Sequence, residues 1–259
     1  MGRKMKVMYL DCFAGIAGDM FLGALIDAGA DIECIREGLS SLDVNGYSFV
    51  VEKKKSYGIA ATKIDVIVEE EQPHRHLKDI VEIIETGSLS DYVKDLAKKV
   101  FMEIAQAEAK VHGTTIEHVH FHEVGAVDSI CDVIGSLLAV ENIKVDKICC
   151  SHLPMGYGSI KCDHGLIPLP APATLEIIKG IPVRNVDVKG ELVTPTGAAL
   201  AKVLAKEFNG FPNMIVECSG YGLGTRDYGF PNVLRVVIGQ EMEDRGNRDV
   251  VEIHHHSHE

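Results

Sequence analysis

Residues able to bind a metal or move a proton gather in one short segment, residues 118–132, with the sequence HVHFHEVGAVDSICD. His120 and His122 flank Phe121, so in an extended chain both imidazoles face the same side. Glu123 follows directly. Imidazole nitrogens suit nickel, copper, iron and zinc, and carboxylates complete a borderline-hard ligand shell. The spacing therefore predicts a metal site at His120 and His122, with Glu123 as a catalytic carboxylate beside it.

Two aspartates extend this cluster onto the helix expected after it. Asp128 and Asp132 are four residues apart, so on a helix they lie on one face. Like charges at that spacing cost about 0.2–0.5 kcal/mol unless a positive charge lies nearby. We predict Asp132 as a further metal ligand and Asp128 as a catalytic group. A polar loop followed by surface carboxylates is the alternative interpretation.

Other histidines could complete such a site. His74 and His76 form a second His-x-His pair just after Pro73, at the entry to a helix, and are predicted as additional metal ligands. The end of the sequence, EIHHHSHE, carries four more histidines predicted to bind nickel weakly: His254, His255, His256 and His258. A remnant of a purification tag is the alternative for this tract.

A glycine-containing turn, DCFAGIAGDM, joins a strand to a helix start near the beginning of the chain. Exposed backbone N–H groups at such a start favour an anion. Gly15 and Gly18 are therefore predicted to bind substrate. Asp11 and Asp19 lie at the two ends of the turn and are predicted as catalytic carboxylates, able to hold a cation or a substrate hydroxyl.

Two later turns have the same character. ELVTPTGAALAK offers the hydroxyls of Thr194 and Thr196 near a helix start. SGYGLGTRDYG adds Gly222 and Gly224 with Arg226, whose planar guanidinium suits phosphate or carboxylate. We predict that these residues bind a small phosphorylated or carboxylated substrate. For each turn alone, plain backbone geometry is the alternative.

Alternating strands and helices must position these residues. In the first half, hydrophobic periodicity predicts a strand at 5–10, a helix from Gly18, a helix at 32–41, two strands around 56–58, a loop that leads into a helix within 71–87, and helices at 88–113 and 127–143. In the second half it predicts a strand from 147, a long Pro/Gly-rich loop up to a helix that tolerates Pro172, a strand at 182–188, a helix at 196–208, and strands at 213–219 and 233–238. The alternation predicts an α/β fold, with mixed α+β as the alternative. We expect subdomains at 1–146 and 147–238 and a polar tail at 239–259.

Composition restricts the class of protein. The chain has 259 residues and a formal net charge of -12, which argues against nucleic acid and anionic membranes as partners. No apolar run approaches the roughly 20 residues of a spanning helix. Its seven cysteines form no CxxC pair, so neither a disulfide framework nor a zinc ribbon is predicted. We expect a cytoplasmic protein.

Several long strings resemble the LarC family of nickel-insertion proteins. They are YLDCFAGIAGDMFLGALIDAGA, HRHLKDI, HFHEVGAVDSICDVIG, HGLIPLPAPATLEIIKG, GELVTPTGAALAK and GYGLGTRDYGFPNVLRV, between about residues 5 and 238. The resemblance implies a nickel chelatase (a cyclometallase of the lyase class). It would insert nickel into pyridinium-3,5-bisthiocarboxylic acid mononucleotide and so form the nickel-pincer nucleotide cofactor of lactate racemase.

The resemblance also implies partners. Family members consume CTP with Mn²⁺ or Mg²⁺ on a second half, which follows a histidine-rich segment and drives oligomerisation. This chain resembles the first half only. Expected partners are therefore the pincer nucleotide precursor, the missing C-terminal half or its separate product, and the lactate racemase maturation proteins. Two alternatives remain open: a non-catalytic nickel store or metallochaperone that binds through the histidine tail, and a metallohydrolase acting on small phosphate esters.

Overall fold

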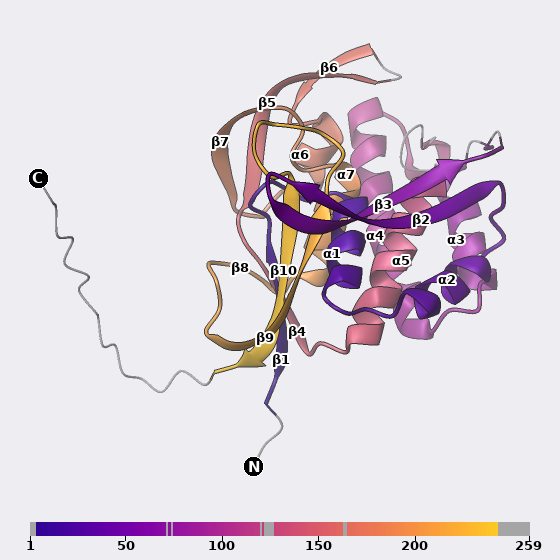
Figure 1. The fold of residues 1–259 in the computed structure, drawn as a ribbon. Coiled ribbons are helices and arrows are strands. Elements are labelled where there is room, and N and C mark those ends of the chain that lie inside the picture. Colours follow the sequence, from indigo (N-terminus) through magenta and orange to yellow (C-terminus); the bar gives the residue numbers. More distant parts are fainter. Residues whose placement is uncertain are drawn as a thin grey trace, which may run out of the picture.

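The computed structural model of the chain describes residues 4–70, 72–73, 75–119, 121, 127–162 and 165–242, and within them it contains two mixed sheets (Figure 1). The larger sheet has the strand order β2-β3-β9-β10-β1-β4-β8. Its strands are β1 (Lys6–Asp11), β2 (Tyr47–Ser56), β3 (Ile59–Val68), β4 (Lys147–Cys150), β8 (Glu207–Phe208), β9 (Met214–Leu223) and β10 (Val233–Glu241). The smaller sheet has the order β6-β5-β7, with β5 (Leu153–Cys162), β6 (Gly165–Leu169) and β7 (Val183–Lys189).

Helices gather on one side of the larger sheet (Figure 1). They are α1 (Gly18–Asp27), α2 (Ile32–Ser40), α3 (Leu77–Thr86), α4 (Asp91–His112), the short 3₁₀ turn η1 (Ile116–His118), α5 (Val127–Ile143), α6 (Pro172–Ile177) and α7 (Pro195–Leu204). This mixture of helices with parallel and antiparallel strands confirms the predicted α/β class. None of the helices described here is long and apolar enough to cross a bilayer.

Strand β1 lies inside the larger sheet, antiparallel to β10 and parallel to β4. Its alternating side chains are buried on both faces, which explains the continuous apolar run at its centre. Met8 and Leu10 enter the main core, and Val7 and Tyr9 enter a second cluster on the opposite face. The main core also encloses α5, which contacts α1, α2 and α4 and is buried on nearly every side.

Glycines on β9 let α1 approach the sheet closely. A Cβ on Gly222 would lie 1.7 Å from the carbonyl oxygen of Met20, and one on Gly220 would lie 2.2 Å from that of Ala24. Any larger residue at these two positions would push the helix away from the strand. This close contact fixes where α1 begins, and Asp19 lies in its first turn.

Two sequence predictions differ from the structure. The loop predicted before Pro172 is wrong, because residues 153–162 and 165–169 form the β5–β6 hairpin instead. Proline is tolerated there since Pro168 lies on an edge strand. The helix predicted to reach residue 208 ends at Leu204, and the chain turns into β8 beside β4, where the Lys206 N–H donates to the Ile148 carbonyl at 2.8 Å.

Strands from both sides of the predicted 146/147 boundary share the larger sheet, and that boundary stays a prediction.

Candidate functional site

A cavity with a volume of about 460 Å³ lies at the start of four helices. Gly18 begins α1, Asp128 is in the first turn of α5, Pro172 begins α6 and Pro195 begins α7, and all four residues line the cavity. Helix starts carry partial positive charge and unpaired N–H groups. The cavity is therefore bordered by backbone that favours negative charge, and several acidic side chains also line it.

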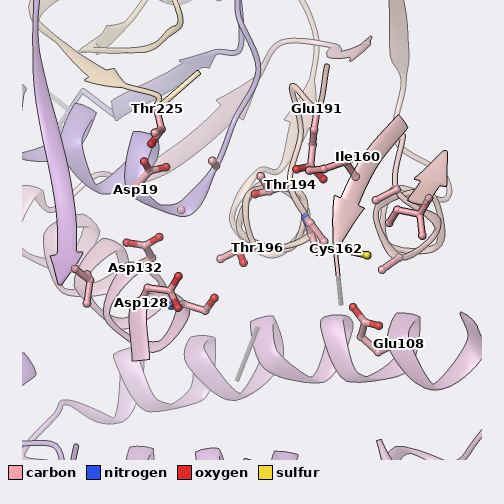
Figure 2. A pocket seen from close by; sticks show the side chains of 18 of the residues that line it. Asp19, Glu108, Asp128, Asp132, Ile160, Cys162, Glu191, Thr194, Thr196 and Thr225 are labelled. Carbon is pink, nitrogen blue, oxygen red and sulfur yellow. The ribbon is translucent and has the colours of Figure 1, made fainter. Parts of the chain in front are cut away.

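Three aspartates from two helices form one side of the cavity, which we call the aspartate wall: Asp19 of α1 with Asp128 and Asp132 of α5 (Figure 2). The i,i+4 spacing thus placed Asp128 and Asp132 together as predicted, and Asp19 joins them across the helix pair. Asp128 keeps access to solvent through the cavity, yet the surrounding protein raises the pKa of its carboxyl, and the charge of Asp19 adds to this.

Asp132 is the most strongly affected member of the aspartate wall. Burial raises the pKa of its carboxyl well above the usual range, and the charges of Asp19 and Asp128 raise it further. The ammonium of Lys63 and a hydrogen bond from the Asp19 backbone N–H oppose this rise. A carboxyl in this state can hold a proton at a pH where an exposed aspartate has lost it, which suits a group that exchanges protons with a ligand.

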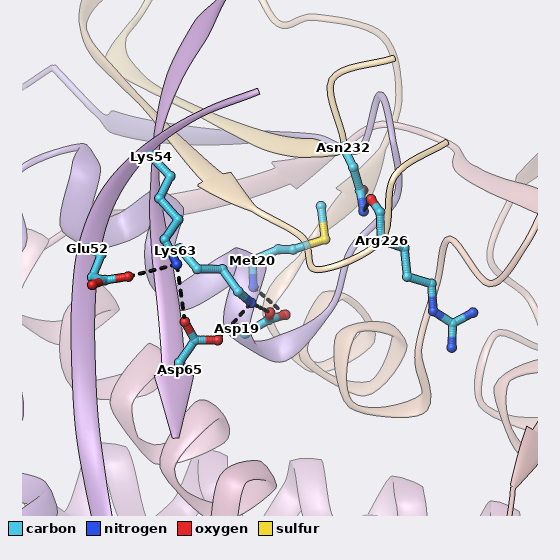
Figure 3. Close-up of polar contacts among 8 residues, drawn as sticks. All are labelled: Asp19, Met20, Glu52, Lys54, Lys63, Asp65, Arg226 and Asn232. Carbon is cyan, nitrogen blue, oxygen red and sulfur yellow. Dashed lines mark hydrogen bonds and ion pairs between the residues drawn. The ribbon is translucent and has the colours of Figure 1, made fainter. Parts of the chain in front are cut away.

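Lys63 supplies the positive charge nearest to the aspartate wall. Its side chain is only 7% exposed, and its Nζ lies 2.5 Å from Asp19 Oδ2 and 3.6 Å from Asp65 Oδ1 (Figure 3). Sequence reasoning missed both Lys63 and Asp65. The available signal was their alternation on β3, because residues two apart on a strand face the same side.

Gly18 allows Asp132 to sit directly against the start of α1. A Cβ at Gly18 would lie 2.7 Å from both Cβ and Oδ2 of Asp132. The predicted role of Gly18 near the ligand thus agrees in position, since it lines the cavity. Gly15 instead belongs to the turn: its φ is +112°, and a Cβ there would lie 1.8 Å from the Leu192 carbonyl oxygen.

Thr194 and Thr196 lie at the start of α7, next to the aspartate wall (Figure 2). Thr194 is the N-cap residue, and its hydroxyl oxygen accepts from the Gly197 N–H at 3.2 Å. Thr196 is only 8% exposed, yet it lines the cavity. Both predicted residues are therefore placed where a ligand in the cavity would meet them.

The opposite side of the cavity has polar groups that sequence reasoning did not assign to a site. Glu108 and His112 of α4 form a pair at 3.2 Å between Oε2 and Nε2. Cys162 of β5 and Glu191 also line the cavity, Cys162 on the side of Glu108 and Glu191 beside Ile160 (Figure 2). The signal for the first two was present, since an i,i+4 pair on an amphipathic helix shares one face. For Cys162 there was none, because the β5–β6 hairpin itself was not predicted, whereas Glu191 stands three residues before Thr194 in the turn that was predicted to bind substrate.

Several predicted residues lie away from this cavity. Asp11 accepts from Nε and Nη2 of Arg235, at 3.0 and 2.5 Å, on the neighbouring strand. His76 is the N-cap residue of α3, with Nδ1 3.0 Å from the Val119 carbonyl oxygen. The guanidinium of Arg226 extends away from Asp19 (Figure 3). Gly222 packs on α1, and a Cβ at Gly224 would lie 2.5 Å from Nδ2 of Asn232.

The remaining predicted site residues lie outside the described residues: His74, His120, His122, Glu123, His254, His255, His256 and His258. Within the part of the chain that the structure describes, no three His, Cys, Asp or Glu side chains are grouped so as to hold a metal ion. The nickel site therefore stays a prediction, and the described acids give no support to a metallohydrolase centre made of them alone.

Comparison with known proteins decides the family. The sequence matches the family of nickel insertion proteins over residues 8–256. The chain belongs to this family. A putative nickel insertion protein of Dictyoglomus thermophilum is 47% identical over 92% of the chain and 62% of its own length.

Two other members of the nickel insertion family carry a longer name, pyridinium-3,5-bisthiocarboxylic acid mononucleotide nickel insertion protein. The one from Staphylococcus epidermidis is 47% identical over 95% of the chain and 63% of its own length. The one from Geobacillus kaustophilus is 48% identical over 92% of the chain and 60% of its own length. The chain thus spans about three-fifths of the length of these curated relatives. No solved structure matches it.

Proposed function

We propose that this chain binds nickel and a pyridinium-3,5-bisthiocarboxylic acid mononucleotide and presents one to the other for metal insertion. The family match over residues 8–256 carries this proposal, because relatives of almost half identical sequence are named for that reaction. The cavity supports it: a volume of about 460 Å³ suits a mononucleotide, and six of the predicted site residues line it: Gly18, Asp19, Asp128, Asp132, Thr194 and Thr196.

Nickel is the substrate that the histidines would collect. His120, His122 and Glu123 precede Asp128 in the sequence by no more than eight residues, so an ion held by them would enter beside the aspartate wall. Nitrogen and oxygen ligands bind nickel but release it to softer sulfur, which the two thiocarboxylates of the precursor provide. A carboxylate such as Asp128 would accept the proton lost when a ring carbon bonds the metal.

The remaining parts of the reaction belong to the rest of the longer relatives. We propose that their additional length supplies the CTP site with Mn²⁺ or Mg²⁺, and that the product is the nickel-pincer nucleotide of lactate racemase. Classification as a lyase, a cytoplasmic location and contact with the lactate racemase maturation proteins belong to the same proposal. So does the division into subdomains 1–146 and 147–238.

An insertion assay tests the proposal. The chain is mixed with the separately produced remainder of a longer relative, CTP, Mn²⁺, Ni²⁺ and the precursor, and the nickel-bound nucleotide is followed by mass spectrometry. We expect conversion only in the complete mixture, because the chain alone is proposed to lack the CTP step. Efficient insertion by the chain alone would contradict that dependence, and no insertion in the complete mixture would contradict the proposed activity.

Nickel binding distinguishes a folded site from a store. In a variant that lacks residues 254–258, calorimetry should still detect one tight Ni²⁺, and His120→Ala with His122→Ala should remove it. If the deletion abolishes most binding, the nickel-store alternative is correct. Unchanged affinity in the double substitution would exclude these two histidines as ligands.

A further inference from the structure

We propose that the aspartate wall recognises the positive charge of the pyridinium ring, and that Thr196 at the start of α7 receives the nucleotide phosphate. The site would thereby select an oxidised, cationic ring over a neutral dihydropyridine. This inference rests on the proposed function and extends it. It assigns the aspartate wall and the start of α7 to the organic substrate and not to the metal.

The aspartate wall has more negative than positive charge. Its three carboxylates face one described ammonium, Lys63, which also contacts Asp65. Asp128 accepts from the Ser129 N–H at 2.8 Å, and Asp132 accepts from the Asp19 N–H. No described lysine or arginine forms an ion pair with Asp128 or Asp132. A ligand cation would supply the missing charge.

An organic cation fits this wall better than a directly bound metal ion. The described acids are not grouped as metal ligands, and a delocalised ring charge requires only nearby carboxylates without coordination geometry. Apolar side chains also line the cavity, including Ile64, Val66, Ile160 and Ile167, so a flat aromatic ring would find both apolar faces and a charged edge.

Thr196 is the second feature that indicates a ligand. Thr196 is only 8% exposed, although it lies on the cavity wall (Figure 2). Its hydroxyl has no hydrogen-bond partner among the described residues. In the first turn of α7, Pro195 has no N–H, and the Gly197 N–H is bound by Thr194. Among the residues that the structure describes, the Thr196 N–H and hydroxyl thus have no partner there. The turn contains no acidic residue, so it can accept a phosphate.

Binding of nicotinamide mononucleotide tests the ring-charge part. The full chain is titrated with the oxidised and the reduced nucleotide in the presence of EDTA, with calorimetry as the readout. The two probes share the ribose and phosphate but differ in ring charge. We expect the oxidised form to bind about tenfold tighter or more, which is the effect of one charge contact in a partly buried site. Asp132→Asn and Asp128→Asn should each reduce that ratio, and Asp43→Asn, which removes an exposed carboxylate elsewhere, should not.

A second comparison tests the phosphate part. Nicotinamide riboside lacks the phosphate, so its affinity should be lower than that of the mononucleotide. Thr196→Val should remove this difference while the preference for the oxidised ring remains, and Thr196→Ser should restore it.

Equal affinity for both oxidation states, no detectable binding, or binding that requires added Ni²⁺ would each overturn the inference. The insertion assay is independent of these titrations. Insertion with no ring-charge preference would refute the inference alone, and charge-selective binding with no insertion would refute the proposed reaction alone.

Discussion

Asp132 shows most directly that the charges of this site lower the stability of the folded chain. Its carboxyl is partly buried on the cavity wall, lies beside two other carboxylates and meets Gly18 so closely that no side chain fits between them. The buried ammonium of Lys63 is shared between Asp19 and Asp65. Folding therefore gathers charges that would be farther apart in the unfolded chain, and an arrangement of this kind is typical of residues kept for function.

We predict that Asp132→Asn stabilises the folded chain at neutral pH. Because the folded pKa of this acid lies above its unfolded value of about 3.8, the folded state binds the proton more tightly. Its contribution to stability is fully present below the unfolded pKa and is lost as the pH rises through the folded pKa. Asparagine does not ionise. At pH 7.5 the free energy of unfolding of the variant should therefore be higher by on the order of 1 kcal/mol, which raises Tm by about 2–4 °C.

Thermal unfolding between pH 7.5 and pH 4 measures this effect. The Tm advantage of Asp132→Asn should shrink toward zero as the pH falls. Asp43→Asn on the exposed surface is the matched control and should shift Tm little at any pH. If the Tm advantage of Asp132→Asn is the same at both ends of the pH range, packing and not charge causes the difference in stability between asparagine and aspartate.

At the residue scale the sequence could predict pairs that one helix or one turn brings together. Asp128 and Asp132 are an example, because helical spacing alone places them on one face. The contact of Lys63 with Asp19 could not be predicted, since it joins residues 44 positions apart, and alternation on β3 could only have placed Lys63 on the same face as Asp65. Arg226 was predicted from its chemistry, but the direction of its side chain depends on how the loop before β10 is held, where the Asn232 Nδ2 donates to the Arg226 carbonyl at 2.8 Å.

The starts of the helices, and the turns that precede them, determine how the elements around the cavity are arranged. Thr194 caps α7, and its own N–H donates to the Ile16 carbonyl at 3.2 Å, so the turn before α1 and the start of α7 are fixed to each other. Gly197 lies so close to this turn that a Cβ there would be 2.2 Å from the Ile16 carbonyl oxygen. Two glycine-containing turns, far apart in sequence, thus define one side of the site.

Removal of the Thr194 cap should weaken both the helix and the site. Thr194→Ala leaves the Gly197 N–H without its partner, and loss of such a cap costs about 1 kcal/mol. We expect a Tm lower by about 2–4 °C, measured by calorimetry, and weaker binding of nicotinamide mononucleotide. Thr194→Ser keeps the hydroxyl and should behave like the parent chain. A loss of the same size with serine would mean that the methyl group, and not the cap, is important.

Helices were easier to predict than strands at this scale. Periodicity and capping residues gave α4 and α5 with ends close to those observed, because a helix bonds to itself. The β5–β6 hairpin was missed because its strands contain prolines and glycines, which usually indicate a loop. Contacts distant in sequence make it a strand: a Cβ at Gly156 would lie 2.3 Å from the Gly190 carbonyl oxygen, so only glycine permits that approach.

At the scale of the whole molecule, both ends of the described chain meet in the middle of one sheet. Strand β1 lies between β10 and β4, and β9 joins β3 through a parallel pair at Thr62 and Gly222. Local sequence patterns hold no information about such an order, since strand partners are chosen by packing over the whole chain. The sequence therefore predicted the fold class but not the sheet.

This topology predicts how the chain behaves when it is cut at the proposed boundary. A fragment of residues 1–146 would expose both sides of β1, and a fragment of 147–242 would expose the partner side of β10. Each fragment alone should therefore lack a cooperative thermal transition by circular dichroism. When the two are refolded together, β1 can insert between β10 and β4, so we expect a cooperative transition and recovery of nucleotide binding. The uncut chain of residues 1–242 is the control. If either fragment unfolds cooperatively alone, the boundary at 146/147 separates independent domains and the shared sheet is not what holds them together.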